Sequence, residues 1–178
     1  MQDSASFMND RFEAVVREID LLLAESARLQ ARGPHFRIEH RFRKAGTICR
    51  AGEEIFAVWL IYRSQLYQLK LSLALRVLFD YLARHGRCAQ SATQIEIGIR
   101  ADQFCARHGA NAKASRKQTR ILARSGVKVY IRRIREALQT ASVEAHLDLD
   151  SSQILMAEPT VGNEVVYRLK GTFAWTHV

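Results

Sequence analysis

The chain has 178 residues, of which 48% are hydrophobic and 25% are charged. These are values of a globular protein, so wholesale disorder is excluded, and the length allows one domain with its own core. The formal net charge of +9 excludes an acidic protein and indicates a polyanionic partner. The longest apolar run, residues 55–62, is too short to cross a bilayer, and the N-terminus does not resemble a signal peptide. We therefore expect a cytoplasmic protein without membrane contact.

The positive charge is concentrated in one segment. Residues 99–138 contain 11 lysine and arginine residues and 2 acidic ones, whereas residues 1–32 and the last 40 residues are both net acidic. A solubilising coat would be spread along the chain, so this concentration favours a nucleic-acid-binding patch. We expect a protein associated with the nucleoid.

No motif points to catalysis or to a bound cofactor. Cys49, Cys88 and Cys105 are far apart and form no zinc-binding pattern with the scattered histidines. A glycine-rich phosphate loop, a pair of catalytic carboxylates and a nucleophile–base arrangement are all missing from the sequence. We expect no enzyme, no catalytic residues, no metal and no cofactor.

The first predicted element is a long helix from Phe7 to Ala31, within a separate N-terminal unit of residues 1–33. Gly33 and Pro34 end it, since proline cannot continue a helix. Two hypotheses remain open for this helix: it packs on its own domain, or it forms a homodimer. Its broad apolar seam favours the homodimer, and the seam repeats at alternating spacings of 3 and 4 through Phe12, Val15, Ile19, Leu22, Ser26 and Leu29.

A small antiparallel sheet is predicted next. Alternating apolar and charged residues over 36–43 indicate a half-exposed strand, and a short strand follows at 47–50. Residues 54–62 are apolar on both faces, which predicts a central, well-covered strand. A last strand over 66–71 completes a sheet of three or four strands.

Two helices are predicted between this sheet and the basic segment. Ser72 is positioned to cap a helix over 73–85 that Gly86 ends. Residues 93–108 fit either a strand or a helix, and we prefer the helix because of its length. Residues 113–124 form a basic connector.

The most informative stretch runs over residues 126–138. On a helix, Val127, Ile131, Ile134 and Leu138 form one apolar stripe, and Ser125 takes the N-cap position. The other side of the helix is cationic. Behind it, apolar runs at 154–156 and 165–169 flank Gly162 and Asn163, which indicates a β-hairpin.

Four aromatic residues offer two interpretations. They lie on segments that alternate like strands, which favours packing in the core over a stacking platform for single-stranded nucleic acid. These residues are Trp59, Tyr67, Phe173 and Trp175.

The order helix, helix, basic helix, hairpin is that of a winged helix. VKVYIRRIREAL resembles the recognition helix of OmpR/PhoB-type response-regulator effector domains, whose pattern is V-x-V-x-I-x-R-L-R-x-x-L. TVGNEVVYRL is similar to the wing of that family, and YQLKLSLALRVLFDYLARHGR to its strand and first helix. The resemblance covers roughly residues 35–169. It implies an α+β winged helix-turn-helix over residues 34–178, with a preceding antiparallel sheet, a C-terminal hairpin wing and the additional N-terminal helix.

The resemblance also implies a function: sequence-specific binding of double-stranded DNA by a dimeric transcription regulator, with helix 126–139 in the major groove and a contact with RNA polymerase. The chain departs from the family in three ways. It has no receiver domain before the sheet, so phosphorylation control is not expected. The segment between the second and third helices is longer than usual. The wing has Gly162, Asn163 and Glu164 where the family often has an arginine.

We assign candidate DNA contacts by chemistry. Arg132 and Arg133 are the first candidates for reading bases, with Lys128 and Tyr130 beside them, because arginine pairs well with guanine. Thr160 and Arg168 of the wing are expected to touch the adjacent backbone. The alternatives are a winged helix that docks proteins and a non-specific nucleic-acid-binding protein. Phosphate contacts, which position a protein without reading sequence, are assigned to Arg116, Lys117, Arg120, Arg124 and Arg135.

Overall fold

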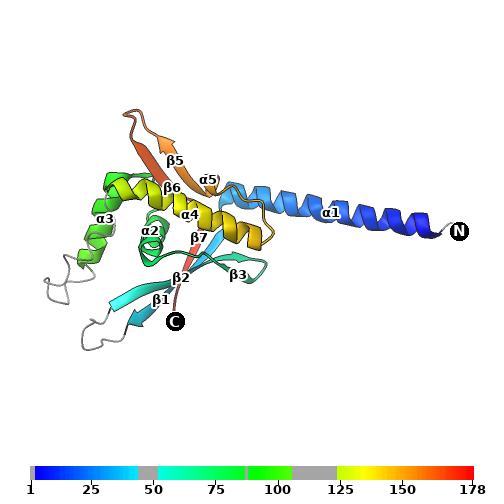
Figure 1. Cartoon of the computed structure of the whole chain (residues 1–178), viewed down its shortest axis with the longest axis horizontal. Coiled ribbons are helices and arrows are strands. Elements are labelled where there is room, and N and C mark those ends of the chain that lie inside the picture. Colours follow the sequence, from blue (N-terminus) through cyan, green and yellow to red (C-terminus); the bar gives the residue numbers. More distant parts are fainter. Residues whose placement is uncertain (1–2, 44–51, 87, 106–123) are drawn as a thin grey trace.

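The computed structural model describes residues 3–43, 52–86, 88–105 and 124–178. Within these ranges the chain is a mixed α+β protein with five helices and two sheets (Figure 1). The predicted α+β class is therefore confirmed. None of the described helices is long and apolar enough to cross a membrane.

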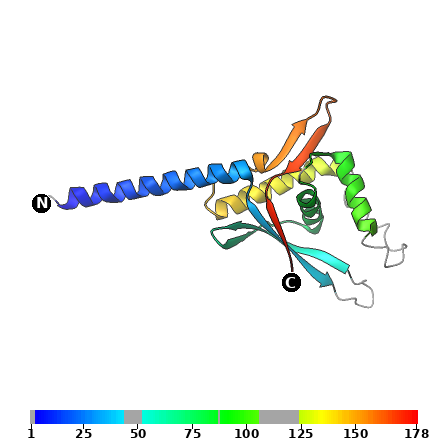
Figure 2. The ribbon, with the colours of Figure 1, turned by 180° about the vertical axis from the view of Figure 1, so that it is seen from behind.

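The N-terminal helix α1, Asp3–Arg32, extends beyond the predicted segment at both ends. It projects from the body of the protein, and only its C-terminal part lies against other elements (Figures 1 and 2). Gly33 ends it with a φ of 82°, a left-handed conformation that favours glycine, and its N–H donates to the Leu29 carbonyl at 2.7 Å. The predicted boundary at Gly33 thus coincides with the end of the helix.

The larger sheet has the strand order β3-β2-β1-β7. Its first three members are β1 (His35–Arg43), β2 (Gly52–Tyr62) and β3 (Gln65–Gln68), and they form the predicted antiparallel sheet. The predicted strand at 47–50 lies outside the described residues. The fourth strand, β7 (Thr172–His177), contains Phe173 and Trp175, which were expected on a strand, but its parallel pairing with β1 was not predicted.

One face of this sheet carries the core. Phe36 and Ile38 of β1 and Val58 and Leu60 of β2 are almost fully buried. Phe56 of β2 is exposed, at the irregularity that leaves it without a paired residue on β1. The prediction that β2 is central is confirmed by its two neighbours, but it is less well covered than its apolar sequence suggests.

Helix α2, Leu73–Arg84, lies on the buried face of the sheet. The Phe79 ring meets Phe36 edge to face, with centroids 5.1 Å apart. Ser72 occupies the N-cap position as predicted, but its side chain makes no capping hydrogen bond.

The uncertain segment is helical: α3 spans Ala92–Cys105, as we preferred. Ile95 and Ile99 are buried while Ile97 is exposed, which a helix explains and a half-buried strand does not. A capping box starts α3, since the Ser91 N–H donates to Gln94 Oε1 at 2.8 Å and the Gln94 N–H donates to Ser91 Oγ at 3.3 Å.

The smaller sheet contains the predicted hairpin, β5 (Leu155–Pro159) and β6 (Val165–Leu169). Asn163 at its tip has a φ of 59°, which asparagine tolerates. A two-residue strand that was not predicted, β4 (Gln90–Ser91), pairs with β6, so the strand order is β4-β6-β5. The short helix α5, Ser151–Ile154, leads into β5.

Candidate nucleic-acid interface

Helix α4, Arg124–Glu144, contains the basic stretch. Val127, Ile131, Ile134 and Leu138 are each at most 5% exposed, so the predicted apolar stripe is confirmed as part of the core. Ser125 lies inside the helix, which begins at Arg124, and the prediction that it is the N-cap is wrong. The stripe fixes the rotation of α4 about its axis, and with it the side that faces solvent.

The solvent side of α4 is mainly cationic. Lys128, Arg132 and Arg133 are all exposed, and at about 100° per residue they spread over the arc opposite the stripe. Arg132 Nε lies 3.5 Å from Glu136 Oε1, and both side chains are mostly exposed. Such a surface ion pair contributes little stability, so the guanidinium can exchange it for another anion or for a base.

Tyr130 lies at the border between this exposed arc and the core. Its side chain is half-buried and packs against the core cluster. The Tyr130 ring therefore lies beside the cationic surface, and part of it packs against the core.

Arg135 has a different role from its neighbours. Its guanidinium donates two hydrogen bonds to the Leu155 carbonyl oxygen, from Nε at 2.8 Å and from Nη2 at 2.6 Å. A charged donor on a main-chain acceptor makes a strong hydrogen bond. Arg135 thus ties α4 to the first residue of β5 and positions the hairpin relative to the basic helix.

The hairpin carries the two remaining candidates that the structure describes. Thr160 is exposed at the end of β5, where its N–H donates to the Glu164 carbonyl at 2.8 Å and closes the loop. Arg168 is half-buried on β6, and its Nη2 lies 3.8 Å from Met156 Sδ on the neighbouring strand. Thr160 is therefore open to solvent at the tip, whereas Arg168 is partly covered by the hairpin itself.

The other candidates are not placed. Arg116, Lys117 and Arg120 lie outside the described residues, and Arg124 is described only as the first residue of α4. Among the described side chains, the structure brings together Lys128, Arg132 and Arg133 on one face. It separates Arg135 from that face by bonding it to β5.

Sequence reasoning missed a polar cluster centred on the buried Asp80 of α2. Its carboxylate accepts a hydrogen bond from Trp175 Nε1 at 2.8 Å, pairs with Arg84 Nη2 at 2.8 Å and lies 3.6 Å from His40 Nε2. The cluster joins α2 to β1 and β7, so it supports the scaffold rather than the basic surface. The sequence offered one indication of this cluster: Asp80 is an acidic residue among the apolar residues of the predicted helix.

Comparisons with models of known protein families, with curated proteins and with solved structures give no match. The functional argument consequently rests on the residues and geometry of the chain itself.

Proposed function

We propose that residues 34–178 form a winged helix that binds double-stranded DNA in a sequence-specific way and regulates transcription. The order of elements supports the fold: helix α2, strand β4, helices α3 and α4, then the hairpin β5–β6. In this arrangement α3 and α4 correspond to a helix-turn-helix, and the hairpin is the wing. The strand β4 between the first two helices completes the small sheet on the wing.

The observation that carries the proposal is the cationic face of α4 opposite a fully buried stripe. An α-helix fits the major groove of B-DNA, where each base pair presents a distinct set of donors and acceptors. Lys128, Arg132 and Arg133 are exposed on a helix that the core holds rigidly. Side chains on a rigid helix lose less freedom on binding than those on a loop, and their positions relative to base edges are better defined.

Within this proposal the candidates divide into three roles. Arg132 and Arg133 read bases, with Lys128 and Tyr130 beside them. Arg135 is a positioning residue, because its hydrogen bonds to Leu155 set the angle between the basic helix and the wing. Thr160 and Arg168 contact the backbone next to the major groove. Phosphate contacts come from the basic connector, through Arg116, Lys117, Arg120 and Arg124.

Footprinting on genomic fragments, at a salt concentration near the physiological value, tests the proposal. We expect protection of discrete sites by the wild-type chain and loss of these footprints with Arg132→Ala. Arg28→Ala is the matched control, since Arg28 is an exposed arginine on α1, and its footprints should be unchanged.

Two results would contradict the proposal. Uniform protection of all sequences would instead indicate non-specific nucleic-acid binding. No binding to any duplex at low salt would leave a winged helix that docks proteins, because fold alone does not determine function.

A further inference from the structure

Helix α1 consists of two parts with different surroundings. Residues 25–32, which we call the root, pack on the body of the protein, whereas residues 11–23, the outer segment, project from it (Figures 1 and 2). Leu29 of the root is buried, and so is Ser26. Every residue from 11 to 20 is exposed.

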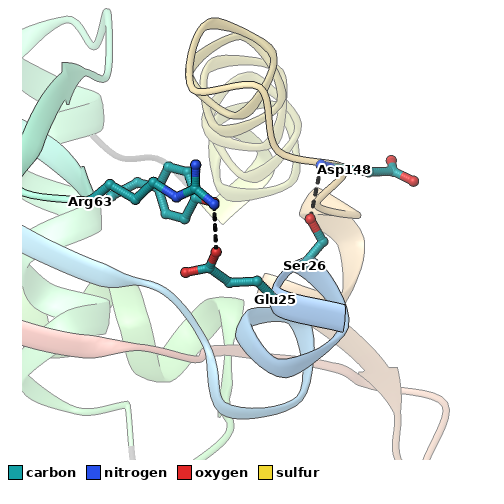
Figure 3. Close-up of polar contacts among 5 residues, drawn as sticks. Glu25, Ser26, Arg63 and Asp148 are labelled. Carbon is teal, nitrogen blue, oxygen red and sulfur yellow. Dashed lines mark hydrogen bonds and ion pairs between the residues drawn. The ribbon is translucent and has the colours of Figure 1, made fainter. Parts of the chain in front are cut away.

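Polar contacts hold the root from two sides (Figure 3). On one side, Glu25 Oε2 accepts from the Tyr62 hydroxyl at 2.8 Å and from Arg63 Nη2 at 3.4 Å, at the turn between β2 and β3. Burial raises the pKa of the Tyr62 hydroxyl, and its hydrogen bond to Glu25 raises it further, so this group remains a donor at neutral pH. On the other side, the Asp148 N–H donates to Ser26 Oγ at 3.4 Å.

Gln30 adds the most specific contact of the root. Its side-chain amide pairs with the main chain of Asp150: the Asp150 N–H donates to Gln30 Oε1 at 2.9 Å, and Gln30 Nε2 donates to the Asp150 carbonyl at 3.2 Å. Residues 148–150 lie in the connection that follows α4, which ends at Glu144, so these contacts hold α1 against the C-terminal end of α4.

The outer segment carries an uncovered apolar stripe. Phe12, Val15, Val16, Ile19 and Leu23 are 68, 54, 39, 49 and 55% exposed. They follow the helical repeat, so they form one continuous surface rather than scattered apolar residues. A contiguous apolar surface on a projecting helix is typical of an interaction site.

Heptad positions describe this surface further. Phe12 and Ile19 take position a, Val15 takes d, and Val16 and Leu23 take e, so positions a, d and e are apolar. Position g is charged on the same side of the helix, with Arg11 one heptad before Glu18. Opposite charges one heptad apart allow a helix to complement a reversed copy of itself.

We propose that the partner is a second copy of this chain, bound antiparallel through the outer segment. The root excludes the parallel arrangement. Ser26 and Leu29 continue the a and d positions of the stripe, and both are buried by the chain's own body. In a parallel pair, the second helix would run along the same side into the space that this body occupies, whereas an antiparallel helix meets only the part of α1 that projects from the body.

The charges select one register. With Phe12 opposite Val15 of the second copy, a two-fold axis passes between residues 13 and 14, and Arg11 of each copy faces Glu18 of the other. A shift of one heptad toward the root brings Glu18 next to Glu18 and carries the first turns of the copy onto residues 25–31, where Ser26 and Leu29 are already covered by the body. A shift in the other direction brings Arg11 next to Arg11. In the selected register α1 overlaps its copy over residues 3–24, which is roughly 33 Å at 1.5 Å per residue. The overlap ends where the root begins.

The mass of the full chain in solution is the first test, by light scattering and sedimentation at micromolar concentration. We expect twice the mass of one chain, and the mass of a single chain for Ile19→Asp. Because Ile19 is half exposed and distant from the body, the melting of the diluted variant should match that of the diluted wild type. A monomeric wild-type chain would overturn the proposal.

Charge reversal tests the antiparallel register. Arg11→Glu places two pairs of glutamates in contact and Glu18→Arg two pairs of arginines, so each variant alone should dimerise about ten-fold more weakly or worse. Mixed together they should form a heterodimer as stable as the wild-type dimer, since every pair is again of opposite charge. The controls Arg28→Glu and Asp20→Arg make the same charge changes at the exposed positions c and b, away from the seam, and should leave the dimer unchanged.

The mixing experiment also gives the contradicting result. In a parallel dimer position g faces the apolar position e, so Arg11 and Glu18 do not face each other across the seam. A parallel dimer therefore predicts that mixing the two variants does not restore the dimer affinity. Absence of recovery would therefore overturn the antiparallel arrangement. Neither experiment uses DNA, so its outcome is independent of the proposed DNA binding.

Discussion

Helices α1 and α4 have similar sequence patterns and opposite surroundings. Both repeat apolar residues at spacings of 3 and 4, yet Ile134 of α4 is fully buried while Ile19 of α1 is half exposed. The stripe of α4 is covered by the rest of the domain along its length, whereas that of α1 is covered only where Ser26 and Leu29 reach the body. Periodicity therefore identifies the apolar face of a helix, but the tertiary structure decides whether that face belongs to the core or to a partner.

The largest effect should separate the two helices directly. Ile134→Ala leaves a cavity in the core and should cost about 2–5 kcal/mol of unfolding free energy. Ile19→Ala should cost less than about 0.5 kcal/mol, measured in urea at a dilution where the chain is monomeric. Similar costs for the two substitutions would show that the outer segment is packed on the body.

A second comparison distinguishes two arginines of α4. Arg135→Ala removes both hydrogen bonds to Leu155 and should cost about 1.5–3 kcal/mol, because they involve a charged donor. Arg133→Ala, at an exposed position, should change the unfolding free energy by less than about 0.5 kcal/mol. If chemical denaturation gave equal values, Arg135 would not be the residue that positions the wing.

A third comparison distinguishes base reading from phosphate binding. Arg132→Ala should reduce discrimination between specific and random duplexes by about 1–3 kcal/mol, the value of a good contact to a base edge. Lys117→Ala should weaken binding to all duplexes alike and reduce the slope of log K against log salt by about 0.9. Fluorescence anisotropy titrations over a salt series measure both, and equal losses on both duplexes for both variants would refute the division of roles.

The smallest effect concerns the link between α4 and the wing. Asp150 caps α5, accepting from the Ser152 N–H at 2.8 Å and from the Ser152 hydroxyl at 2.6 Å, and these hydrogen bonds lower the pKa of its carboxyl group. Asp150→Ala should cost about 1 kcal/mol at neutral pH. A lowered pKa means that the charged form stabilises the fold above the ordinary pKa and that this contribution disappears as the pH falls through the lowered one. Thermal melts of the two chains should thus converge in acid, and a constant difference down to that pH would contradict the assignment.

Local patterns predicted most of the elements. The 3–4 repeats of α1, α2 and α4 and the alternation in β1 give the element type, because side-chain direction repeats with the backbone period. The hairpin followed from Gly162 and Asn163, which suit a tight turn. The helix preferred for the segment now seen as α3 was confirmed by the exposure of Ile97 between two buried isoleucines.

Long-range contacts were not predictable in the same way. Strand β7, near the C-terminus, pairs with β1, which begins at His35. Phe173 was expected in the core, but the residues around it do not indicate which strand β7 pairs with or that the pairing is parallel. Strand β4 has only two residues, too few for any alternation. The acceptor of Arg135 is a main-chain carbonyl twenty residues away, which no side-chain pattern records. Consequently the sequence shows which residues of α4 are cationic, but it did not predict that Arg135 forms hydrogen bonds within the protein.

Selection of bound sequences from a random pool of duplex DNA tests the central claim most directly. If α4 reads bases, the wild-type chain should enrich a defined motif, and Arg132→Ala should lose information at specific positions of that motif. With the antiparallel dimer, the motif should contain two inverted half-sites, because a two-fold axis relates the two copies. A pool that remains random after repeated rounds with the wild-type chain would contradict sequence-specific recognition by α4.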